Sequence, residues 1–126
     1  MKTILVDAWN TFVTEEGVFV NMREMLDAFP NKKIILTNAN DDEMKTFGIV
    51  NMPYEIFTLA HNPNKTDPTY YTMMLEYFGL NPVDVVYFEH NPEAVESAKS
   101  VGITVFQYDK ETKNLEALKN FLEKNS

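Results

Sequence analysis

Short apolar runs alternate along the chain with stretches in which apolar residues recur every three or four positions. Short runs rich in valine, isoleucine and aromatic residues are typical of buried strands. We therefore predict about five strands, at residues 4–7, 33–37, 55–59, 84–89 and 103–107. The first predicted strand ends abruptly on Asp7, and polar, turn-prone residues follow it.

The stretches with helical spacing begin at residues suited to capping a helix. Asn21, Asn40, Asp67 and Asn91 are placed to accept hydrogen bonds from first-turn N–H groups. Helices are therefore expected at residues 22–29, 41–47, 68–78, 92–99 and from 112 onward. Residues 14–20, which contain a single glycine, are expected to form a short connection.

The alternation of strands and helices predicts an α/β fold with a parallel sheet and helices on both faces. Right-handed crossovers make such a three-layer sheet doubly wound and Rossmann-like, so the winding direction must reverse at one point. If this reversal lies between the first and fourth strands, Asp7 and Glu89 become neighbours. A chain of 126 residues is expected to form one domain, spanning residues 1–126.

Composition excludes several classes of protein. The chain has no cysteine, which rules out disulfides, thiolate catalysis and cysteine-based zinc sites and fits a cytoplasmic location. A net charge of -8 with scattered basic residues disfavours nucleic-acid binding. The apolar run before Asp7 is too short for a secretory signal, and no run approaches a membrane span, so no membrane partner is expected.

Four motifs stand in order at the predicted strand ends and helix starts. They are Asp7-Ala8-Trp9-Asn10-Thr11, Thr37-Asn38, Lys65-Thr66-Asp67-Pro68-Thr69-Tyr70-Tyr71 and Glu89-His90-Asn91-Pro92. Over nearly its whole length the chain resembles a small member of the haloacid dehalogenase (HAD) superfamily. That family has a nucleophilic aspartate in D-x-D-x-T, a Thr or Ser at the second strand end, a lysine before a helix and an acidic fourth motif. The resemblance implies a HAD core without a cap domain, because too few residues follow the first and second motifs.

The resemblance also implies roles for individual residues. Asp7 and Lys65 would be catalytic: the aspartate attacks an electrophilic centre, and the lysine offsets negative charge. The substrate would be bound by Thr37, Asn38, Trp9, Thr11 and His90. Mg²⁺ would be held by Asp7, the backbone carbonyl of Trp9, and Glu89. The expected partner is a small phosphate ester, or a protein whose surface covers the open site.

Three positions depart from the pattern of the family's phosphatases. Trp9 stands where the second aspartate protonates the leaving group and later activates water, and it has no proton for that role. Glu89 is one methylene longer than aspartate, and His90 replaces the second acid of its pair. His90 is a candidate substitute acid or base. An aromatic residue at the position of Trp9 also occurs in the family's magnesium-independent dehalogenases.

Three hypotheses remain open from the sequence. The first is a HAD-like hydrolase with Asp7 as nucleophile. The second is a catalytically degenerate relative that binds a phosphorylated ligand or a protein. The third, a phospho-accepting receiver domain, suits the length but is disfavoured because Lys65 precedes a helix rather than following the fifth strand.

Overall fold

The computed structural model describes all residues from Met1 to Ser126. Its centre is a five-stranded sheet in the order β5-β4-β1-β6-β7. The strands are β1 (Thr3–Asp7), β4 (Lys33–Thr37), β5 (Glu55–Thr58), β6 (Val85–Glu89) and β7 (Thr104–Gln107). All four neighbouring pairs are parallel. The predicted α/β fold with five parallel strands is confirmed.

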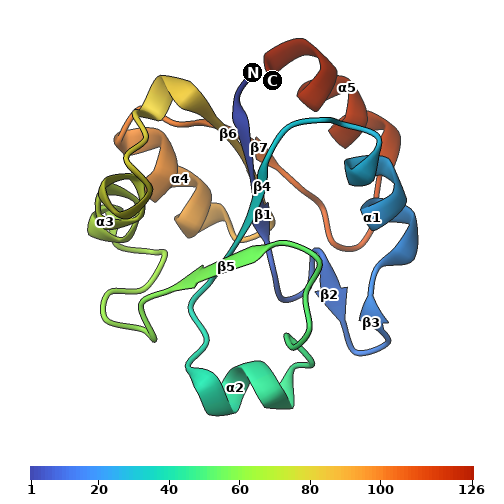
Figure 1. Cartoon of the computed structure of the whole chain (residues 1–126), viewed down its shortest axis with the longest axis horizontal. Coiled ribbons are helices and arrows are strands. Elements are labelled where there is room, and N and C mark those ends of the chain that lie inside the picture. The colour runs from blue at the N-terminus through green and yellow to red at the C-terminus, as the bar shows by residue number, and fades with distance from the viewer.

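Helices cover both faces of the sheet and make three layers (Figure 1). On one side lie α3 (Pro68–Phe78) and α4 (Pro92–Ser100); on the other lie α1 (Val20–Asp27) and α5 (Leu115–Asn125). A short 3₁₀ helix, η1 (Pro82–Asp84), leads into β6. Asp67 caps α3 by accepting a hydrogen bond from the Thr69 N–H, and Asn91 caps α4 in the same way through Glu93. These caps and the prolines that follow them fix where α3 and α4 begin.

Two hydrophobic clusters lie on the two faces of the sheet. Alternate residues of each buried strand point to opposite faces, so β1 contributes Ile4 and Val6 to one cluster and Leu5 to the other. The first cluster is completed by residues of α1 and α5, and the second by residues of α3 and α4, chiefly Tyr70, Tyr71, Met74, Leu75 and Ala98. β1 is therefore buried on both faces, as expected for a central parallel strand.

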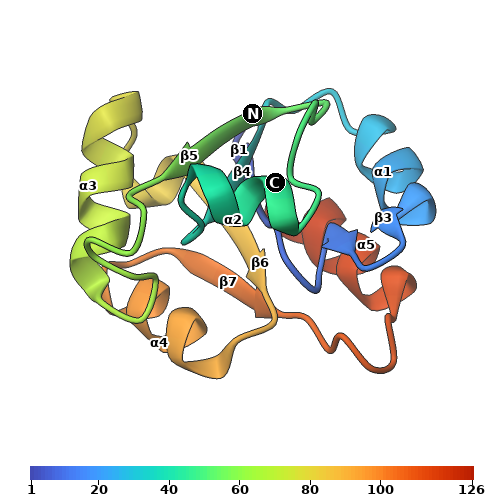
Figure 2. The ribbon, with the colours of Figure 1, turned by 90° about the horizontal axis from the view of Figure 1, so that it is seen from below.

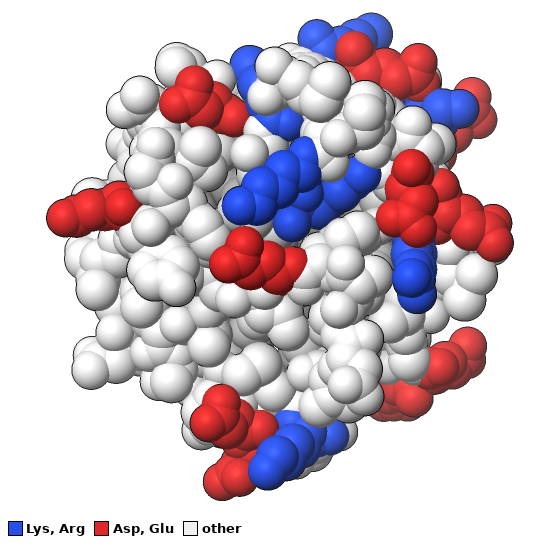
Figure 3. Space-filling view, in the orientation of Figure 1, with Lys and Arg blue, Asp and Glu red and all other residues white.

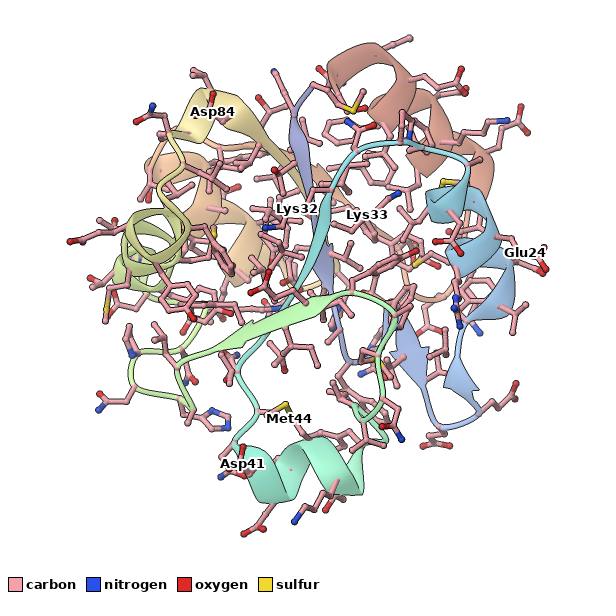
Figure 4. All side chains as sticks on the ribbon, in the orientation of Figure 1. Glu24, Lys32, Lys33, Asp41, Met44 and Asp84 are labelled. Carbon is pink, nitrogen blue, oxygen red and sulfur yellow. The ribbon has the colours of Figure 1, made fainter.

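The winding of the sheet reverses between β1 and β6, the first and fourth strands of the sheet along the chain. The strands run in one direction, so their carboxyl ends lie together at one edge of the molecule. Figure 4 shows Asp84, just before β6, at the opposite end of the molecule from Asp41 and Met44 of α2 (Asp41–Thr46). Viewed from below, α2 lies in front of the strand ends (Figure 2). Asp7 and Glu89 end neighbouring strands at this edge, as the sequence predicted.

Two local predictions were wrong. Residues 14–20 contain a small antiparallel hairpin of β2 (Val13–Thr14) and β3 (Gly17–Val18), in which Gly17 has a φ of 100° that favours glycine. α1 begins at Val20 after Phe19, which makes no side-chain cap, so Asn21 lies inside the helix and does not cap it. This hairpin after β1 and the six-residue α2 after β4 are both short, and neither forms a cap domain.

The charged residues are spread over the surface in mixed pairs. On the face shown in Figure 3, basic and acidic side chains lie close together, and a broad area carries few charges. Lys32 pairs with Glu55 at 3.5 Å, for example. No helix is both long enough and apolar enough to cross a membrane. On this face, basic residues therefore form no continuous stripe.

Burial of the central strand β1 predicts a loss of stability when one of its side chains is shortened. Leu5 is fully buried in the cluster below α3 and α4. Leu5→Ala should lower the free energy of unfolding by about 2–5 kcal/mol, because it removes buried methyl groups and leaves a cavity. Urea denaturation measures this loss. Val83→Ala is the control, because Val83 is 73% exposed and its change should stay within about 0.5 kcal/mol. Equal losses in the two variants would contradict the assignment of the core.

Candidate functional site

Asp7 lies at the carboxyl end of β1 and is only 2% exposed. Its Oδ1 accepts a hydrogen bond from Lys65 Nζ at 2.7 Å, and its Oδ2 accepts one from Thr11 Oγ1 at 2.6 Å. Burial by itself raises the pKa of Asp7, but Lys65 and His90 together lower it well below its usual range. Asp7 is therefore a buried, ionised carboxylate that several donors hold in one orientation.

Lys65 joins two carboxylates. Its Nζ lies 2.7 Å from Asp7 Oδ1 and 2.9 Å from Glu89 Oε1, and the residue is 5% exposed. Burial lowers the pKa of Lys65, but the charges of Asp7 and Glu89 raise it well above its ordinary value. The backbone N–H of Lys65 donates to Asn38 Oδ1 at 2.7 Å, so the end of β4 fixes the loop that carries the lysine. The structure thus brings Asp7, Lys65 and Glu89 into direct contact.

Glu89 is held by three donors. Oε1 accepts from Lys65 and from the hydroxyl of Tyr87, and Oε2 accepts from the Asn91 N–H at 3.0 Å. Tyr87 and Glu89 are two residues apart on β6, so their side chains point to the same face of the sheet. Burial and the neighbouring Asp7 raise the pKa of Glu89, while Lys65 partly offsets this effect. Burial also raises the pKa of Tyr87 well above its usual value, so its hydroxyl stays a donor.

His90 contacts the same oxygen of Asp7 as Thr11 does. Its ring Nδ1 lies 2.5 Å from Asp7 Oδ2 and 3.1 Å from Thr11 Oγ1. The backbone N–H of His90 also donates to Asp7 Oδ2, at 3.3 Å. Burial lowers the pKa of His90, but the hydrogen bond and charge of Asp7 outweigh this and raise it. The ring is half-buried, and its side chain remains 21% exposed toward the pocket.

A pocket of about 160 Å³ opens beside Asp7 at the strand ends. Thr37 and Asn38 line it from the end of β4, and the Thr37 hydroxyl accepts a hydrogen bond from the Ala39 N–H at 3.1 Å. The predicted binding residues Trp9 and His90 also line it, whereas Thr11 is buried behind Asp7. Thr11 therefore supports the carboxylate and does not form part of the pocket wall.

Trp9 forms an aromatic wall of the pocket. Its ring stacks on Phe47, with centroids 4.5 Å apart and planes inclined by 25°. The chain turns sharply just after Trp9: Asn10 has a φ of 66°, a left-handed conformation that asparagine tolerates. The indole thus takes up packing space at the position where the resemblance leads one to expect an acid.

Sequence reasoning missed two further polar residues that line the pocket. Glu43 of α2 and His61 of the following loop both line it, and their side chains pair at 2.6 Å. This bond raises the pKa of His61, and a second bond from its ring to Asn64 adds to the effect. Glu43 also completes the capping box of α2 with Asn40. No local sequence pattern signals this pairing of residues 18 positions apart.

The donor set fits Mg²⁺ poorly. Asp7, Glu89 and His90 place one ligand atom each within 4.8 Å of one another. Mg²⁺ requires oxygen ligands at about 2.0–2.1 Å in octahedral geometry, and imidazole is not among its preferred ligands. Every carboxylate oxygen of Asp7 and Glu89 already accepts at least one hydrogen bond from the protein. An ion at Asp7 Oδ2 would have to displace the donors from Thr11 and His90.

Comparison with solved structures finds HAD proteins. The chain superposes with a TM-score of 0.72 on a HAD family enzyme from Bacteroides thetaiotaomicron, in an aspartate-to-alanine mutant complexed with magnesium and inorganic phosphate. That match has 11% identity and covers 87% of this chain and 95% of the other. A second match is the core domain of a candidate phosphoglycolate phosphatase from Streptococcus pneumoniae, with a TM-score of 0.66, 18% identity and coverage of 98% and 96%.

A longer HAD-superfamily hydrolase from Geobacter sulfurreducens matches with a TM-score of 0.56 and 20% identity over 73% of this chain. The chain spans 47% of the length of that protein. No protein-family model matches the sequence, and a search of curated proteins gives no match. The chain therefore has the HAD-like α/β fold, as the motifs predicted.

The buried ion pairs predict a strong effect of removing the lysine. Lys65→Met should lower the free energy of unfolding at pH 7 by about 3–5 kcal/mol, because two buried carboxylates lose their shared cation. The carboxylates then bind protons more readily in the folded than in the unfolded state, so the loss should shrink as the pH falls toward 5. Chemical denaturation at both pH values measures this. Lys99→Met, on the exposed face of α4, is the control. A loss in Lys65→Met no larger than in the control would refute the predicted role.

Proposed function

We propose that this protein is a HAD-like hydrolase that uses Asp7 as the nucleophile on a phosphate monoester. The observation that carries the proposal is the buried Asp7 carboxylate at the end of β1, paired at 2.7 Å with Lys65 and bordering a pocket. The HAD fold, the phosphatase descriptions of two structural neighbours and the inorganic phosphate bound in a third support the choice of reaction. We propose Thr37, Asn38 and His90 as the groups around the phosphoryl oxygens.

The proposed reaction has two displacements. In the first, a carboxylate oxygen of Asp7 forms a bond to phosphorus while the bond from phosphorus to the leaving oxygen breaks. This gives an aspartyl phosphate and an alkoxide or phenoxide. In the second, water attacks phosphorus and restores Asp7, releasing inorganic phosphate and a proton. The Lys65 ammonium offsets the negative charge that accumulates as the anionic ester approaches Asp7.

The pocket restricts what can reach Asp7. Its volume of about 160 Å³ suits a phosphoryl group with a small substituent. The wall formed by Trp9 and Phe47 is apolar, while Glu43 contributes an acid to the pocket lining. We therefore propose a small-molecule phosphate ester, or a phosphorylated side chain on a protein whose surface covers the opening.

A second candidate function is supported by Trp9. The residue that would donate a proton to the leaving group is replaced by an indole that packs on Phe47. Loss of a positioned acid or base typically costs about 10²- to 10⁴-fold in rate. The alternative is a protein that binds a phosphorylated ligand or a protein partner at the same pocket and does not turn it over.

Hydrolysis of an activated ester separates the two candidates. The protein should hydrolyse 4-nitrophenyl phosphate, whose leaving group needs no protonation, and Asp7→Asn should reduce the rate to background because the nucleophile is lost. Release of 4-nitrophenol is followed by absorbance. Asp42→Asn, on the exposed surface of α2, controls for preparation and should keep the wild-type rate. Equal rates in wild type and Asp7→Asn would exclude the enzyme and favour the binding protein.

Because Trp9 stands where the proton donor is expected, restoring an acid at this position should increase the rate of hydrolysis. Trp9→Asp should raise the rate on an alkyl phosphate by about 10²-fold or more, because a carboxyl group can then protonate the poor leaving group. Phosphate release measures the rate. Trp9→Phe is the matched control, because it opens space at the pocket but supplies no proton. A similar gain in Trp9→Phe would show that bulk, rather than the missing acid, limits turnover.

A further inference from the structure

We propose that His90 and Lys65 together hold Asp7 in the way that a divalent cation would, so that this site binds and reacts without Mg²⁺. His90 is a positioning residue for Asp7. The part of this inference that concerns turnover rests on the proposed function, whereas the part that concerns metal binding does not.

The first observation is the number of donors on the inner oxygen of Asp7. Oδ2 accepts from Thr11 Oγ1 at 2.6 Å and from the backbone N–H of His90 at 3.3 Å, and it contacts the ring Nδ1 of His90 at 2.5 Å. A carboxylate oxygen has about two lone-pair sites. The three contacts fill both, and they leave no lone pair of Oδ2 directed at an ion.

The second observation is the protonation that this contact requires. The pair of His90 Nδ1 and Asp7 Oδ2 is attractive only if the ring nitrogen carries the hydrogen, because an ionised carboxylate offers no donor. A nitrogen that carries a hydrogen has no lone pair for a metal. His90 therefore acts toward Asp7 as a donor, and its Nδ1 cannot be one of three metal ligands in the group with Glu89.

The third observation is distance. Neighbouring ligands around Mg²⁺ lie about 2.9 Å apart when each bond is about 2.05 Å long. His90 Nδ1 and Asp7 Oδ2 lie 2.5 Å apart, in direct contact. The imidazole therefore stands where an ion bound to Oδ2 would be, and no ion fits between these two atoms.

The fourth observation is that both carboxylate oxygens of Glu89 also accept hydrogen bonds from the protein. Lys65 Nζ and the Tyr87 hydroxyl donate to Oε1, and the Asn91 N–H donates to Oε2. The Lys65 ammonium already bridges both carboxylates at 2.7 and 2.9 Å. The chain thus supplies the positive charge and the orientation that Mg²⁺ would otherwise supply to these two acids.

Direct binding of the metal tests the proposal. Isothermal titration calorimetry with MgCl₂ on the wild-type protein should show no binding tighter than about 10 mM. His90→Asp should bind Mg²⁺ at least about tenfold more tightly, because it removes the donor from Asp7 and adds an oxygen ligand. His90→Ala opens the position without adding a ligand and should fall between the two. Thr104→Asp adds a carboxylate at an exposed position at the opposite end of the sheet and should behave as wild type.

Wild-type binding of Mg²⁺ tighter than about 10 mM would overturn the proposal, as would a His90→Asp variant that binds no more tightly than wild type. Circular dichroism establishes that each variant is folded, and His90→Ala supplies the comparison if His90→Asp is not folded.

The rate of hydrolysis of 4-nitrophenyl phosphate by wild type should be the same within about twofold in EDTA and in MgCl₂. A large activation by MgCl₂ would overturn the inference while leaving the hydrolase in place. Absence of turnover in both conditions would reject the hydrolase but leave the calorimetry decisive for the metal.

Discussion

The Lys65 ammonium lies between two carboxylates that are almost fully buried, and the positions of the surrounding elements depend on it. Asp7 ends β1, Glu89 ends β6, and Lys65 precedes α3, so one cation joins three distant parts of the chain. Burial of either acid without this partner would cost several kcal/mol. The lysine therefore allows a core sheet to end in charged groups at the edge where the pocket opens.

The alternation of side chains along β6 determines which face of the sheet carries the site. Val86 and Phe88 pack under α1 and α5, while Tyr87 and Glu89 point to the face that α3 covers. Lys65 approaches from that face, just before α3, and its ammonium lies 6.0 Å from the centre of the Tyr87 ring. The site is thus a continuation of the second hydrophobic cluster, in which the last layer of side chains is polar.

Much of the fold was predictable from the sequence because it depends on local patterns. Buried strands, proline-initiated helices and the adjacency of Asp7 and Glu89 follow from periodicity and the winding rule. The start of α1 and the β2–β3 hairpin were not predicted, because short elements carry weak signals. The pairing of His90 with Asp7 and of Glu43 with His61 joins residues 83 and 18 positions apart, and only tertiary structure reveals such contacts.

The contacts of α2 have a dynamic consequence. This helix has six residues, none of them buried, and its links to the pocket are the stack of Phe47 on Trp9 and the bond from Glu43 to His61. A segment with so little buried surface opens far more often than the sheet unfolds. Amide hydrogens of α2 should therefore exchange with solvent through local opening, independently of global unfolding. Ligand entry at the mouth of the pocket therefore depends on a segment that is less stable than the core that carries Asp7.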